Sequence, residues 1–250
     1  MSFTLEICCY NYQSCIIAAQ NGADRIELCA DAAEGGTTPG YGTIKLVKEK
    51  AGIDLFPIIR PRGGDFFYNE EEFIVMKSEV LLCKELGCEG VVIGMLQQDG
   101  SIDKEHCKKL VALAYPMSVT FHRAFDRANN PFEALEAIIE IGCDRVLTSG
   151  HKPAAIEGAQ LLDELIRQAN DRIIVMPGAG IRSANITEVA KKTGAVEFHS
   201  SAAVKLDSSM LFVNTGMQEN LQTIVADKEE ILGMREKLAA YFSTDAAAAS

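Results

Sequence analysis

The sequence has no tryptophan, few aromatic residues and a shortage of positive charge. Its 250 residues contain 24 Lys and Arg against 35 Asp and Glu, which gives a formal net charge of −11. A nucleic-acid-binding protein normally carries a basic surface, and attraction to anionic lipid needs one too. No apolar run approaches the ~20 residues that a membrane-spanning helix requires. We therefore expect neither nucleic acid nor a membrane among the partners.

We expect no secretion signal from the opening segment, and the cysteines do not have the spacing of a zinc finger. The opening segment MSFTLEICCYN carries no basic stretch followed by an apolar one, which predicts a cytoplasmic protein. Eight cysteines occur, and in a chain of this length without a signal we expect them to be reduced thiols. No two of them form a CxxC pair, which argues against a zinc ribbon and a thioredoxin-type centre.

Short apolar strands alternate with helical patterns along the chain. Four strands follow a glycine that closes the preceding helix. Two of these segments, GADRIELC from Gly22 and GCDRVLTS from Gly142, are similar enough to each other to suggest an internal repeat. The predicted strands are Leu5–Cys8, Arg25–Cys29, Leu55–Arg60, Gly90–Ile93, Ser118–His122, Arg145–Thr148, Ile173–Met176 and Glu197–Ser200. Eight such units predict an α/β fold in which residues 1–250 form a single (β/α)8 TIM barrel.

Two segments lie outside this alternation. Residues 206–224 form a long connection that serves as a loop, a cap or an oligomer contact. A last helix is predicted at about Lys228–Tyr241. The tail at 243–250 ends in an alanine run, and we expect it to be frayed.

The first two strands repeat one pattern, LEIC and IELC. Because side chains alternate along a strand, Glu6 and Cys8 share one face, as Glu27 and Cys29 do on the next strand. The apolar residues between them should face the helices, so these four should point into the barrel. Neighbouring strands lie ~4.8 Å apart, so equivalent positions should bring the two thiols together and the two carboxylates together. The thiols are then either ligands for a soft ion such as Cu(I) or small buried filler.

Polar residues also follow the third and fifth strands, at the barrel end that normally carries active sites. Buried carboxylates need partners, and Arg60, Arg62, His122 and Arg123 are the candidates. The cluster is either a structural ion-pair network or an active site. In an active site Glu6 or Glu27 would act as general base and His122 as acid or base, while the arginines would neutralise substrate charge.

The last two strands end in segments suited to an anion. Gly178 and Gly180 follow the seventh strand, and His199 and Ser200 end the eighth. Barrels often bind phosphate through backbone N–H groups at this place. The alternative is that the glycines only form a tight turn. Asp65, in the PRGGDF segment, completes the candidate ligand-binding set.

Several motifs together resemble the CutC family of copper homeostasis proteins. They are LEIC, GADRIELC, EGGTTPGYG, IIRPRGGDFFY, GVVIGMLQQDGSID, TFHRAFD, RVLTSG, PGAGI and EFHSS, and they run from about residue 5 to residue 204. The resemblance implies a TIM barrel, a cytoplasmic location and homo-oligomers, commonly dimers. It also implies Cu(I) as the bound ion, with Cys8 and Cys29 as its ligands.

Three functions therefore stand open at the level of sequence. In the first, Cys8 and Cys29 hold Cu(I), and Glu6 and Glu27 tune the site. In the second, the barrel is an enzyme that acts on a small anionic or phosphorylated ligand. In the third it is a scaffold whose polar interior is only an ion-pair network, which ranks last because clustered charges cost stability unless they are fully paired.

Overall fold

Eight parallel strands build the wall of a barrel in the computed structural model, which describes residues 2–248 and their side chains to residue 243. The strands are β1 (Thr4–Cys9), β2 (Arg25–Leu28), β3 (Asp54–Pro57), β4 (Gly90–Ile93), β5 (Ser118–Phe121), β6 (Arg145–Thr148), β7 (Ile174–Pro177) and β8 (Glu197–Ser200). They form two four-stranded sheets, in the orders β3-β2-β1-β8 and β4-β5-β6-β7. A parallel bridge between Ile58 and Val92 joins β3 to β4, and β7 packs beside β8. The predicted (β/α)8 barrel is confirmed.

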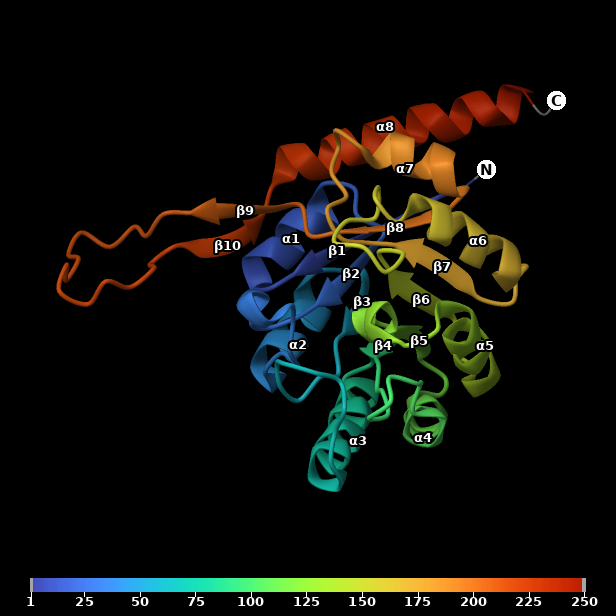
Figure 1. Cartoon of the computed structure of the whole chain (residues 1–250). Coiled ribbons are helices and arrows are strands. Elements are labelled where there is room, and N and C mark those ends of the chain that lie inside the picture. The colour runs from blue at the N-terminus through green and yellow to red at the C-terminus, as the bar shows by residue number, and fades with distance from the viewer. Residues whose placement is uncertain (1, 249–250) are drawn as a thin grey trace.

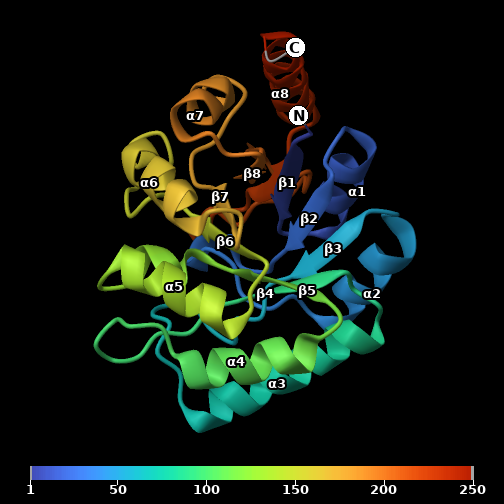
Figure 2. The same cartoon turned by 90° about the vertical axis from the view of Figure 1, so that its right-hand side faces the viewer.

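Helices surround the strands, as Figure 2 shows in a view in which they ring the centre. They are α1 (Tyr12–Gln20), α2 (Tyr41–Lys50), α3 (Glu70–Glu85), α4 (Lys104–Ala114), α5 (Pro131–Ile141), α6 (Ala159–Ala169), α7 (Ile186–Thr193) and α8 (Lys228–Ala248), with short 3-10 turns η1 (Ala32–Glu34) and η2 (Arg123–Arg127). No helix in residues 2–248 is long and apolar enough to cross a bilayer.

Local sequence explains where the helices begin and end. The side chain of Asn130 accepts hydrogen bonds from the first turn of α5, and Pro131 occupies a helix-start position where its missing N–H costs nothing. Gly142 then ends α5 with φ of 89°, a left-handed conformation that suits glycine. Asn69 and Glu72 form a reciprocal capping box at the start of α3.

The barrel has an apolar outer layer and a charged interior. Leu5, Ile7, Ile26 and Leu28 belong to the large core cluster between strands and helices. The residues that alternate with them on β1 and β2 are also buried, but they are Glu6, Cys8, Arg25 and Glu27. The prediction that Glu and Cys point inward is confirmed, and the interior of the barrel therefore holds charges that must be paired.

The C-terminal part differs from the prediction. Residues 203–226 form an antiparallel hairpin of β9 (Ala203–Leu206) and β10 (Thr223–Ala226), here called the arm, which projects away from the barrel in Figure 1. Helix α8 continues to Ala248 instead of ending at Tyr241, so residues 243–248 of the predicted frayed tail are helical. Residues 249–250 of that tail lie outside the described residues.

Candidate functional site

The two strand-end thiols lie together. The Sγ atoms of Cys8 and Cys29 are 3.7 Å apart, and both side chains are buried. The Glu27 carboxylate completes a group of three whose ligand atoms all lie within 4.8 Å of one another. The prediction that the first two strands bring the thiols together is confirmed.

The carboxylates are arranged differently from the prediction. Strands β1 and β2 are staggered, so that Cys8 lies opposite Glu27 and Glu6 lies opposite Arg25. The same stagger offsets Glu6 from Glu27 as it offsets Cys8 from Cys29, and no hydrogen bond joins the two carboxylates directly within the described side chains. His199 from β8 connects the two instead: its Nδ1 is 2.7 Å from Oε1 of Glu6, and its Nε2 is 3.5 Å from Oε2 of Glu27.

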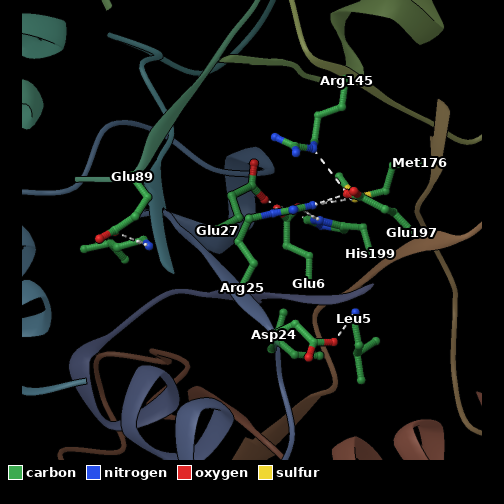
Figure 3. Close-up of polar contacts among 12 residues, drawn as sticks. Leu5, Glu6, Asp24, Arg25, Glu27, Glu89, Arg145, Met176, Glu197 and His199 are labelled. Carbon is green, nitrogen blue, oxygen red and sulfur yellow. Dashed lines mark hydrogen bonds and ion pairs between the residues drawn. The ribbon is translucent and has the colours of Figure 1, made fainter. Parts of the chain in front are cut away.

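A buried ion-pair network lies below the thiols. Arg25 binds the carboxylates of both Glu6 and Glu197, and its Nη2 is 2.6 Å from Oε2 of Glu197. Arg145 from β6 binds the same Glu197 oxygen at 3.2 Å. Figure 3 shows Arg25 crossing the barrel between these groups. The partners of the inward carboxylates are thus Arg25, Arg145 and His199, not the strand-end residues Arg60, Arg62, His122 and Arg123 that we expected.

Hydrogen bonding makes the two thiols unequal. The hydrogen bond with Cys29, assisted by His199, holds the pKa of Cys8 well below its usual range, although burial alone raises it. The same hydrogen bond, together with burial, raises the pKa of Cys29 well above its usual range. These two shifts favour the thiolate form at Cys8 and the protonated form at Cys29. A thiolate is the form of cysteine that binds metal.

The two inward carboxyls also differ. Burial raises the pKa of Glu6, but the charge of Arg25 and the hydrogen bond with His199 outweigh it, and the pKa falls to about 2. Burial raises the pKa of Glu27 well above its usual range, and the charge of Cys8 raises it further. Glu6 thus stays ionised and orients His199, whereas burial and the charge of Cys8 favour the protonated form of Glu27.

A cavity of about 260 Å³ opens above Cys8 at the carboxyl ends of the strands. Eight residues predicted from sequence lie together around it: Cys8, Glu27, Arg60, His122, Arg123, Gly180, His199 and Ser200. A side chain at Gly94 would collide with His122, because a Cβ there would lie 2.3 Å from the imidazole Cε1. The glycine at the end of β4 therefore makes room for the histidine at the end of β5.

Comparison with known proteins places this barrel in a family. The sequence profile of the CutC family matches residues 3–204. The chain belongs to the CutC family. A family protein CutC from Parabacteroides distasonis is 47% identical over 242 residues, which cover 96% of this chain and 100% of that protein. The human protein named copper homeostasis protein cutC homolog is 47% identical over 215 residues, 86% of this chain and 79% of that one.

Solved structures agree on the fold. The copper homeostasis protein CutC from Streptococcus agalactiae is 30% identical, with a TM-score of 0.76 over 80% of this chain and 98% of that chain. N-(5'-phosphoribosyl)anthranilate isomerase from Pyrococcus furiosus is 13% identical, with a TM-score of 0.56 over 95% of this chain and 99% of that chain. At that identity the isomerase supports the barrel fold alone.

Some predicted residues of this CutC-family chain lie away from the cavity. Arg62 pairs with Glu72 and with Asp65, whose Oδ1 is 3.0 Å from Nη1 of Arg62, on a partly exposed loop. Gly178 is not among the residues that line the cavity, and a Cβ there would lie 2.4 Å from Cδ1 of Leu147 and 3.3 Å from the His199 ring. The structure thus separates the Arg62–Asp65 pair from the group that surrounds the cavity.

Other residues of the site were not predicted from the sequence. Tyr10, Phe66, Arg182 and Ser201 also line the cavity. Tyr10 could have been found from the alternation along β1, since it follows Cys8 by two positions. Arg182 directly follows the glycine loop after β7, where a cationic side chain would reach a ligand.

Proposed function

We propose that this CutC-family protein binds Cu(I) in the cytoplasm through Cys8 and Cys29, as a part of copper homeostasis. The observation that carries the proposal is the pair of buried sulfurs 3.7 Å apart, of which Cys8 also lines the cavity. Soft thiolate ligands suit Cu(I), as they also suit zinc and iron–sulfur clusters. Family membership supports the same ion, because relatives carry the name copper homeostasis protein.

The separation of the sulfurs suits one shared ion. Metal–thiolate bonds are about 2.3 Å long, so two sulfurs on one ion lie at most ~4.6 Å apart. The observed 3.7 Å lies inside that limit and is much longer than a disulfide bond. Cys8 and Cys29 would hold the ion from two adjacent strands.

The surroundings of the thiols support a sulfur-based site. Cys8 and Cys29 pack with Phe56, Ile58 and Val92 in a small apolar cluster inside the barrel. Such surroundings limit the contact of the sulfurs with water to the side of Cys8 that faces the cavity. Glu27 stands near both sulfurs, but carboxylates suit hard ions, so its part would be to adjust the charge beside the site.

An anaerobic Cu(I) competition titration tests the proposal. The wild type should take one Cu(I) from a chelator of known affinity, and Cys8→Ser/Cys29→Ser should fail to do so. Cys107→Ser is the matched control, because Cys107 is a buried thiol on α4 whose pKa burial raises to about 12. Equal Cu(I) affinity in the wild type and the double variant would contradict the proposal.

We also propose that the protein forms a homo-oligomer through its arm. The tip of the arm exposes a set of large apolar side chains: Met210, Leu211, Phe212, Val213, Met217 and Leu221. Contiguous exposed apolar surface of this kind is typical of an interaction site. A second copy of the chain would cover it with the same residues, as symmetric dimers do.

A further inference from the structure

The cavity above the thiols is cationic, although the protein as a whole is acidic. Arg60, Arg123 and Arg182 line it, and Glu27 is the one Asp or Glu among its lining residues. Of the three arginines, Arg123 pairs with Asp126. The chain carries a formal net charge of −11, so a cationic hollow in it is a local exception. A cleft lined by one sign of charge concentrates ligands of the opposite sign.

Arg60 is a buried cation without a counter-charge. It is 4% exposed, and its guanidinium donates to the backbone carbonyls of Glu34, Gly36 and Gly64. Within residues 2–243 it forms no ion pair, and its Nε has no hydrogen-bond partner. Leaving a buried charge uncompensated is costly, so an anion or an acceptor that met this Nε would be favoured.

His122 presents a second unpaired donor to the same cavity. It is 2% exposed, and its Nδ1 accepts a hydrogen bond from the backbone N–H of Ala124 at 3.1 Å. The proton of the neutral ring is therefore on Nε2, which is buried and has no partner within the described side chains. Phe66 contacts both groups, with its ring centroid 4.8 Å from the Arg60 Cζ and 5.0 Å from the His122 ring.

The loop after β7 offers donors as well. Ala179 and Gly180 have φ of 77° and 67°. The backbone N–H groups of Ala179, Gly180 and Ile181 donate to no acceptor in the part of the chain that the structure describes. The Nη2 of Arg182 donates to the carbonyl of Ala203 and pairs with no carboxylate of that part. Consecutive free N–H groups in such a turn form an anion-binding concavity, and barrels often bind phosphate after the seventh strand.

We propose that this cavity binds a small phosphate ester that carries a second acceptor group, such as a carboxylate or a carbonyl. The phosphate would lie on the Ala179–Ile181 loop beside Arg182. The second group would accept hydrogen bonds from Nε of Arg60 and Nε2 of His122. A volume of about 260 Å³ limits the ligand to a small metabolite, since it lies below the ~300 Å³ at which pockets for drug-sized molecules begin. None of these donors is a thiol, so the proposal goes beyond the Cu(I) site.

Calorimetric titration with 2-phosphoglycolate tests the proposal, because this compound carries both groups on the smallest frame. Inorganic phosphate and glycolate each supply one of the groups, and both should bind more weakly than the combined probe. Arg182→Met and Arg60→Lys should each weaken binding of 2-phosphoglycolate about tenfold or more, through the loss of a charge-assisted contact. Arg62→Met is the matched control, since Arg62 lies on the same loop as Arg60 but outside the cavity, and it should bind like the wild type.

A second readout covers the case in which a variant does not fold. In the wild type, 2-phosphoglycolate should shift the NMR amide signals of Ala179 and Gly180 at saturation. The double variant Cys8→Ser/Cys29→Ser should keep this binding, which separates the proposal from the Cu(I) site. Absence of binding to the wild type would overturn the proposal. So would equal affinity of folded Arg182→Met and Arg62→Met.

Discussion

Replacing Arg25 by methionine should destabilise the barrel strongly, because this side chain joins two buried carboxylates. Arg25 contacts both Glu6 and Glu197 from the first position of β2, and all three are buried. Breaking a buried ion pair by removing one partner typically costs about 3–5 kcal/mol, since a charge is left uncompensated. Glu6 keeps His199 and Glu197 keeps Arg145, so we expect the lower end of that range, about 3 kcal/mol.

The loss should be visible in thermal unfolding. For a chain of this size 1 kcal/mol corresponds to about 2–4 °C in Tm, so Arg25→Met should lower Tm by about 6–12 °C. Arg172→Met is the control, because the Arg172–Glu136 pair is exposed, and it should change Tm by less than about 2 °C. Adding Glu197→Gln to Arg25→Met should restore part of the stability by removing the orphaned charge. A Tm for Arg25→Met within about 2 °C of the wild type would refute the reasoning.

Two further predictions concern His122 and the arm. Burial, and next the charge of Arg60, lower the pKa of His122 to about 3, against ~6.5 in the unfolded chain. Between these two pH values only the unfolded chain binds the proton. His122 therefore lowers the free energy of unfolding by about 1.4 kcal/mol for each unit by which the pH falls. In urea unfolding, the free energy of unfolding of His122→Gln should fall less steeply than that of the wild type between about pH 6 and 4.5. Parallel plots of this free energy against pH for the two proteins would contradict the lowered pKa of His122. For the arm, Leu211→Ser/Phe212→Ser should lower the mass measured by light scattering to that of one chain; an unchanged oligomer, or a monomeric wild type, would show that the arm does not hold the assembly.

The sequence was sufficient for the barrel and for the inward carboxyl and thiol side chains of its first two strands. Eight short apolar strands, several preceded by helix-ending glycines, define the alternation, and the period-2 pattern of β1 and β2 places Glu6, Cys8 and Glu27 inside. These features are local, so they can be deduced from neighbouring residues without knowledge of the tertiary structure.

The partners of these residues depend on the stagger between strands, which local sequence does not specify. Closing eight tilted strands into a barrel shifts each strand against its neighbour. Cys8 consequently lies opposite Glu27, and the position opposite Glu6 is taken by Arg25. Arg25 and Arg145 could have been found as inward residues, because they occupy the same place in GADRIEL and GCDRVLT. Both arginines begin their strands, whereas the residues predicted for the site lie toward the carboxyl ends of the strands.

The arm and the end of α8 were not predicted for different reasons. A two-stranded hairpin that projects from the barrel has little core to impose an alternating pattern, and the segment between its strands is rich in Ser, Asn and Gln. The alanine-rich tail was interpreted as frayed from its position at the terminus. Alanine has the highest helix propensity, however, and α8 continues to Ala248.

The central claim is that Cys8 and Cys29 together bind one Cu(I) ion, and copper X-ray absorption of the loaded protein tests it most directly. The wild type with one Cu(I) per chain should have two sulfur neighbours at about 2.3 Å, the usual metal–thiolate distance. Cys29→Ser should have one sulfur neighbour at that distance. A wild-type spectrum with only nitrogen or oxygen neighbours, or two sulfurs retained in Cys8→Ser/Cys29→Ser, would contradict the account.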